Sequence, residues 1–225
     1  MDQIGVRETV ELAGFTFNWE TLCMTWLTMA IVILIAFLAT RSLKLVPHGW
    51  QLVLEGVVTW LHGQIDAMMG KNGRFLEPFI VSLFMFLLVS NWLGLVPTLS
   101  SPTNDLNTTL ALALTVIVMV HGLGIYRKGF HYIKHFFEPF PIFIIINLVE
   151  EVSKPITLAC RLFGNILAGE ILIAVLLLLV PIWMPIPSVV WLGFSVFIGA
   201  VQAVIFTMLS TAYLANAVKD DESES

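Results

Sequence analysis

Long runs of apolar residues alternate with short polar segments along most of the chain. The runs over 21–40, 78–96 and 108–126 contain no Asp, Glu, Lys or Arg. A helix needs about 20 apolar residues to cross the roughly 30 Å hydrocarbon core of a membrane. Each of the three runs therefore predicts a membrane-spanning helix.

Two further runs are much longer. They cover 142–180 and 188–217 and are separated by the proline-rich segment PIWMPIP. As single helices rising about 1.5 Å per residue, they would be about 58 and 45 Å long. Both exceed the thickness of the hydrocarbon core, so they predict two long helices that tilt or protrude.

The segment over 48–70 has a different pattern, in which polar residues recur at helical spacing on an apolar background. Gln51, Glu55, Thr59, His62 and Asp66 follow one another at steps of four, four, three and four. A single polar stripe of this kind is typical of an amphipathic helix lying in a membrane interface. We expect such a helix on the cytoplasmic face.

The positions of the basic residues predict the orientation of the five spans, because short loops rich in Lys and Arg stay in the cytoplasm. The loops after the first, third and fifth spans hold Arg41, Lys44, Lys71, Arg74, Arg127, Lys128, Lys134 and Lys219. The opposite side has only Arg7. We therefore expect an extracytoplasmic N-terminal segment (1–20) and a disordered acidic cytoplasmic tail (218–225). A bacterial plasma membrane fits, although a plastid origin stays open.

Composition supports this membrane class and excludes several others. The 225 residues are 58% hydrophobic and only 12% charged, with a mean hydropathy of +0.90, whereas soluble domains have about 25% charged residues. The net charge of −5 arises from the acidic ends, so nothing indicates nucleic-acid binding. Cys23 and Cys160 lie in apolar runs and match no disulfide or metal pattern. We expect an all-α membrane protein that forms a single membrane domain, with no metal or cofactor.

The run over 142–180 contains charges that a membrane helix normally excludes: Glu150, Glu151, Lys154, Arg161 and Glu170. A central Arg costs about 2.5 to 3.5 kcal/mol on insertion scales. At 100° per residue, Arg161 and Glu170 point to opposite sides of the helix, which disfavours a salt bridge between them. Carboxylates are also absent from the interiors of the other spans. We therefore expect the counter-charge of Arg161 to come from another subunit or a moving ion, with another helix of this chain as the alternative.

Other polar residues in the last two runs could serve either ion transport or ordinary packing and contact with the membrane interface. Counted from the proline-rich loop, Gln202 lies at about the depth of Arg161, so its amide could orient the guanidinium. Ser195 packs closely or hydrogen-bonds a neighbouring helix. Glu150, Glu151 and Asn147 fit either an ion pathway or headgroup water. Lys154 is expected to extend to the interface, and the five histidines to lie near it.

Three segments together resemble the a subunit of F-type ATP synthases. They are KPITLACRLFGNILAGE (154–170), SNWLGLVPTLSSPTNDLNTTLALAL (90–114) and QAVIFTMLSTAYL (202–214). Their order and spacing agree with that family over roughly 20–217. R-L-F-G-N followed by G-E, together with a late Q-A-x-I-F, is a highly specific combination.

The resemblance implies a stator subunit that is not itself an enzyme. It implies two offset half-channels against a rotating c ring, with ion flow coupled to rotation and ATP synthesis. The partners would be c-ring subunits, peripheral-stalk b subunits, other ATP synthase subunits and lipid. The ion would be H⁺, with Na⁺ left open. The long helices would form a tilted hairpin along the ring.

The resemblance also assigns residues to roles. Arg161 takes the place of the essential arginine, with Asn165 and Gln202 as polar companions. Gly164 and Ala168 would allow close approach to the ring. The half-channels would use Glu170, Ser195, Asn91, Asp105, Glu150, Glu151 and Asn147. Many relatives have a histidine or an acid where this chain has Ser195, so a proton relay there would need Glu170 and water.

Two other classes of function were weighed on the residues alone. A stand-alone transporter would bind an anionic solute through Arg161, but the chain lacks the inverted repeats common in such proteins. An intramembrane hydrolase would need a nucleophile motif that GFSVF around Ser195 does not provide.

Overall fold

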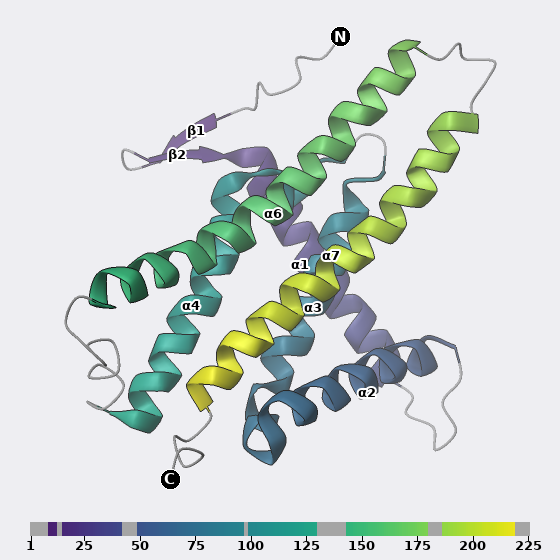
Figure 1. Ribbon diagram of the computed structural model, residues 1–225. Coiled ribbons are helices and arrows are strands. Elements are labelled where there is room, and N and C mark those ends of the chain that lie inside the picture. Colours follow the sequence, from purple (N-terminus) through teal and green to yellow (C-terminus); the bar gives the residue numbers. More distant parts are fainter. Residues whose placement is uncertain are drawn as a thin grey trace.

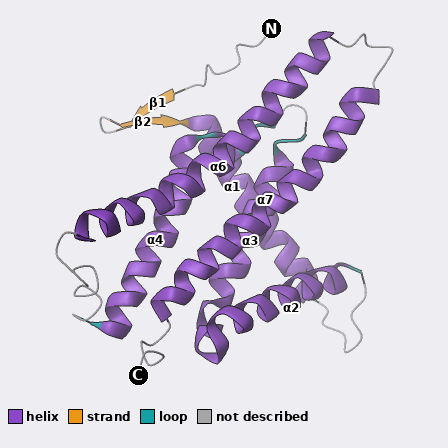
Figure 2. Ribbon diagram, viewed as in Figure 1, coloured by secondary structure: helices purple, strands orange, loops and turns teal. Residues whose placement is uncertain are grey.

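The computed structural model describes residues 9–12, 15–41, 49–96, 99–129, 143–179 and 186–218. Apart from one pair of strands, its regular elements are helices (Figures 1 and 2). The α-helices are α1 (Trp19–Thr40), α2 (Trp50–Met69), α3 (Glu77–Leu93), α4 (Leu106–Lys128), α6 (Phe143–Leu179) and α7 (Ile186–Val218). Two 3₁₀ segments, η1 (Gly70–Leu76) and η2 (Pro102–Asn104), precede α3 and α4.

Five helices in the described part are long and apolar enough to cross a membrane. They are α1, α3, α4, α6 and α7, and each coincides with one of the apolar runs to within a few residues at either end. The prediction of five membrane-embedded helices is therefore confirmed at the level of length and composition. The tail over 219–225 and the basic residues Arg7, Lys44, Lys134 and Lys219 lie outside the described residues.

A short β-hairpin precedes α1 and departs from the all-α expectation. Strand β1 (Thr9–Leu12) pairs antiparallel with β2 (Phe15–Asn18), Val10 lying opposite Phe17. β-Branched and aromatic residues favour strands. The alternation of polar and apolar residues within TVEL and FTFN is typical of strands, but residues 1–20 were considered only as an acidic segment outside the membrane.

The two long helices lie side by side and run obliquely across α3 and α4 (Figure 1). α6 packs against α4 and α7, whereas α7 packs against α3, α4 and α6. The shared core is formed by fully buried apolar side chains, among them Val116, Leu158, Leu162, Ala203 and Phe206. This arrangement brings polar residues of α3, α6 and α7 to one site.

Helix α2 crosses the ends of the other helices at a steep angle (Figure 1). Leu61, Ile65 and Met69 are buried in the core, whereas Leu52 and Val53 are more than half exposed. The predicted helix is thus present. Its placement in a membrane interface stays a prediction.

Candidate functional site

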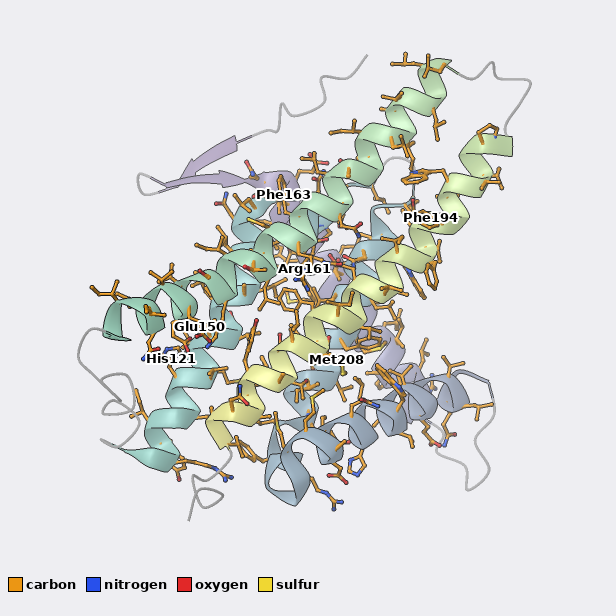
Figure 3. The ribbon with its side chains drawn as sticks, viewed as in Figure 1. His121, Glu150, Arg161, Phe163, Phe194 and Met208 are labelled. Atoms are coloured by element: carbon orange, nitrogen blue, oxygen red, sulfur yellow. The ribbon has the colours of Figure 1, made fainter. Side chains whose placement is uncertain are left out.

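Arg161 lies near the middle of α6, and its side chain extends into the space between α6 and α7 (Figure 3). The guanidinium is exposed, and no ion pair or hydrogen bond joins it to any described residue. The described part of the chain therefore gives Arg161 no carboxylate partner, as its sequence context led us to expect. A charge at the centre of an apolar helix is costly in a membrane unless it is paired.

Gln202 of α7 is only 6% exposed, and its amide nitrogen has no hydrogen-bond partner in the described part of the chain. The expected contact with the guanidinium of Arg161 is not formed as a hydrogen bond. Leaving a buried donor unsatisfied costs about 1 to 3 kcal/mol. The amide of Gln202 is therefore a buried, unsatisfied hydrogen-bond donor on α7.

A cavity of about 350 Å³ opens between α3, α6 and α7. Four polar residues singled out from the sequence line it together: Asn91, Asn165, Glu170 and Ser195. The rest of the wall is largely apolar and includes Trp191, Phe194 and Ile198. The fold therefore places one carboxylate, two amides and a hydroxyl around a single space large enough for several water molecules.

Glu170 is held in this cavity by Asn104, which was not among the predicted site residues. The amide of Asn104, in the turn η2, donates a hydrogen bond to Oε2 of Glu170. Asn104 is 8% exposed. A neutral donor stabilises a carboxylate without cancelling its charge. The sequence offered only the turn-forming run SPTND as a signal for this contact.

Asn91 connects three elements at the wall of the cavity. Its Nδ2 donates to the carbonyl of Gly199 at 2.9 Å, and its Oδ1 accepts from Oγ1 of Thr103 at 3.2 Å. Next to it, Nε1 of Trp92 donates to the carbonyl of Val196 at 3.1 Å. These bonds fix α3 against α7 and the turn η2.

Asp105 is not among the described residues that line the cavity. It is the N-cap of α4, where Oδ1 accepts from the backbone nitrogen of Asn107 at 2.9 Å. Its Oδ2 accepts from Asn18 and from Oγ1 of Thr21 in α1. Asp105 therefore ties the start of α4 to the start of α1, one residue away from Asn104.

A second polar cluster lies where α4 meets the first part of α6, and Figure 3 shows His121 and Glu150 there. Nζ of Lys154 lies 2.6 Å from Oε1 of Glu151 and 3.3 Å from Oε1 of Glu150. It also lies 5.7 Å from the centre of the Tyr213 ring. Two carboxylates of its own helix thus hold Lys154, and its position at the membrane interface stays a prediction.

The comparisons with known proteins agree with these features. A family model described as ATP synthase A chain matches residues 22–215. The relatives are named ATP synthase subunit a, and that of Desulforamulus reducens is 45% identical over 91% of this chain and 81% of its own length. The relative from Acidothermus cellulolyticus is 40% identical over 95% of this chain and 82% of its own. A third, from Moorella thermoacetica, is 39% identical, covering 89% and 91%.

The chain belongs to the ATP synthase subunit a family.

This membership confirms the predicted family and, with it, the role of a proton-translocating stator subunit in the membrane sector of an ATP synthase. A subunit a works together with the other subunits of its complex and not as an enzyme by itself. The alternative of a stand-alone transporter is thereby overturned. As a relative of bacterial ATP synthase subunits, the chain is a multi-pass membrane protein.

Two small residues of this subunit a chain leave the helix surface near Arg161 open. Gly164 and Ala168 are exposed, and a Cβ added at Gly164 would meet no atom within 4 Å. In the described part of the chain, no three His, Cys, Asp or Glu side chains are grouped to hold a metal ion. The chemistry that the site offers is that of carboxylates, amides and one guanidinium.

Proposed function

We propose that this subunit conducts protons through two offset half-channels that meet the rotating c ring at Arg161. The observation that carries the proposal is the exposed guanidinium on α6, which has no ion-pair partner among the described residues. The counter-charge would be supplied, in turn, by each carboxylate of the passing ring.

Arg161 would act through its fixed charge. A guanidinium stays protonated at any working pH, so it cannot relay protons itself. A positive charge nearby lowers the pKa of a carboxyl group. A ring carboxyl that approaches Arg161 would therefore release its proton before it passes. This would prevent protons from crossing directly between the two half-channels.

The cavity beside Glu170 supports the outer half-channel. Glu170 is its titratable group, and Asn165 and Ser195 supply polar contacts for water on the same wall. The Ser195 hydroxyl does not titrate near neutral pH, so Glu170 and water would carry the proton. Asp105 would act indirectly, by holding the turn that presents Asn104 to Glu170.

The cluster at the start of α6 supports the inner half-channel. Glu150 is exposed and Glu151 is partly buried, and both contact Lys154. Asn147 lies one turn earlier on the same helix and is partly buried. Protons would pass here between the cytoplasm and the ring.

Ion flow would drive rotation because each proton crosses the membrane in two partial steps. The membrane potential supplies about 2.3 kcal/mol per elementary charge per 100 mV. Gly164 and Ala168 would let a ring helix approach α6 closely. Peripheral-stalk b subunits would hold the chain fixed while the c ring turns.

The orientation in the membrane is part of the proposal. The N-terminus would lie outside a bacterial plasma membrane and the C-terminus in the cytoplasm, because the basic loops follow α1, α4 and α7. Helix α2 would lie in the cytoplasmic interface, where Glu55 and Thr59 are exposed to water.

The test is ATP-driven proton pumping by the whole complex in vesicles with Arg161→Ala. We expect pumping to be abolished while the complex still assembles and hydrolyses ATP. Arg41→Ala is the matched control, because Arg41 is an exposed arginine at the end of α1, and it should pump normally. Normal pumping by Arg161→Ala would overturn the proposal. Protonophore-resistant uptake of Na⁺ by the unaltered complex would overturn the choice of protons.

A further inference from the structure

His121 was expected to be an interfacial residue, but the structure places it against the charged cluster of α6. Its Nε2 lies 3.8 Å from Oε2 of Glu151, and the two side chains are 32% and 18% exposed. His121 comes from α4 and Glu151 from α6, so the pair forms only because these helices pack together. Figure 3 shows His121 at this junction.

The other ring nitrogen of His121 fixes its tautomer. Nδ1 lies 2.9 Å from the backbone carbonyl of Ile117, one turn earlier on α4. A carbonyl oxygen can only accept a hydrogen bond, so Nδ1 must carry a hydrogen. In the neutral ring Nε2 is then the acceptor nitrogen, and it lies 3.8 Å from Oε2 of Glu151.

The two carboxylate oxygens of Glu151 differ in their contacts. Oε1 is 2.6 Å from Nζ of Lys154, whereas Oε2 is buried and has no hydrogen-bond partner in the described part of the chain. A lone pair facing a buried carboxylate oxygen is unfavourable, because both groups are acceptors. A proton on Nε2, or a water between the two atoms, would satisfy both.

Charged and titratable groups of two helices surround the pair. From α6, Glu150 and Glu151 both contact Lys154. From α7, the ring of Tyr213 lies 5.7 Å from Nζ of Lys154.

We infer that His121 and Glu151 form a proton-binding pair that loads and unloads the inner half-channel. An acid at the cytoplasmic surface, hydronium or a buffer, loses its O–H proton, and an N–H bond forms at Nε2 of His121 beside Glu151. The N–H bond then breaks as a water molecule in the half-channel accepts the proton, and the ring returns to its neutral form. The inference rests on the proposed function.

The place of the pair along α6 suits this task. Glu151 precedes Arg161 by ten positions, which is about 15 Å along the helix axis. The pair also lies toward the end of α6 that follows the basic loop after α4. Lys154 clamps one oxygen of Glu151 and acts as a positioning residue.

The test replaces His121 by Gln in the whole ATP synthase, reconstituted with its ATP-hydrolysing part facing outward. ATP-driven pumping is measured while the outer pH is raised from about pH 6 to about pH 8.5, across the range in which histidine titrates. We expect pumping relative to the unaltered complex to fall about tenfold at the alkaline end and to stay within about twofold at the acidic end, because proton capture limits the rate only when protons are scarce.

Two further variants separate proton binding from structure. Glu151→Gln should show the same pH-selective loss, and the double variant should be no worse than either single one, because the two residues act as a unit. His62→Gln is the matched control. His62 also pairs with a glutamate, Nδ1 lying 2.9 Å from Oε2 of Glu77, but it belongs to α2. It should pump like the unaltered complex at every pH.

A ratio that does not change with pH, or normal pumping by both His121→Gln and Glu151→Gln, would overturn the inference. Arg161→Ala, measured in the same assay, distinguishes this failure from that of the proposed function. If Arg161→Ala stops pumping and His121→Gln has no effect, only the inference fails. If Arg161→Ala pumps normally, the half-channel proposal fails first.

Discussion

Asn104 donates a hydrogen bond to Glu170, joining the turn before α4 to α6 across 66 positions of sequence. The bond adds no charge at Glu170, because its partner is a neutral amide. It also fixes where Glu170 enters the cavity between α3, α6 and α7. The geometry of the proposed outer half-channel therefore depends on a turn, and not only on the long helices.

Replacing Asn104 by Ala should remove this support. We expect ATP-driven pumping to fall severalfold, because Glu170 can then turn away from the cavity, while assembly of the complex is retained. Asn107→Ala is the control, since the Asn107 side chain is exposed two residues after Asp105. Equal pumping by the two variants would contradict a role for Asn104 in holding Glu170.

Gly199 of α7 packs against Asn91 and Trp92 of α3. A Cβ at this position would lie 3.3 Å from Cβ of Asn91 and 3.4 Å from Cδ1 of Trp92. Gly199→Leu should therefore separate the two helices and destabilise the chain by about 1 to 3 kcal/mol. Thermal unfolding in detergent micelles measures the change. Gly193→Leu, on the same helix, should have little effect because its Cβ would meet no atom within 4 Å.

Substitutions at Asp105 distinguish a role in proton transfer from a role in stabilising the start of α4. Asp105→Asn keeps a capping side chain for α4, whereas Asp105→Ala loses it. We expect Ala to cost about 0.5 to 2 kcal/mol of stability as a lost N-cap, and Asn to cost less. Proton pumping by Asp105→Asn should persist. Its loss, with the fold intact, would show that Asp105 carries protons after all.

A substitution at Gln202 should affect stability and proton pumping differently. Its buried amide nitrogen has no hydrogen-bond partner in the described part of the chain. Gln202→Met removes the unsatisfied donor at similar volume, so stability should be unchanged or higher. Pumping should nevertheless fall, since the polar companion of Arg161 is lost. Thr207→Val removes another buried unpartnered group on α7. It should match the stability result and leave pumping unchanged.

Much of the fold follows directly from hydrophobic patterning. Uncharged runs of sufficient length predict spans, and the single polar stripe over 48–70 predicts the helix α2. Counting residues from the proline-rich loop predicts the depth of Gln202 but not its burial between helices. These features depend on one segment at a time, which is why a single sequence is enough to predict them.

The contacts between helices could not be predicted from the sequence in the same way. The bond between Asn104 and Glu170 and the approach of His121 to Glu151 depend on how α4 crosses α6, which no local pattern encodes. Likewise, the sequence alone did not predict that Lys154 contacts both Glu150 and Glu151. An Asp directly before the apolar run is typical of a helix N-cap, but the resemblance to the family assigned Asp105 to a half-channel.

The bonds by which Asn91 and Trp92 attach α3 to α7 end on the main-chain oxygens of Gly199 and Val196. Every amino acid supplies such an oxygen, so the attachment depends on the course of the α7 backbone and is indifferent to the side chain at 196. Changing the side chain of Val196 should therefore leave this bond in place. At position 199, in contrast, a larger side chain would crowd Asn91 and Trp92.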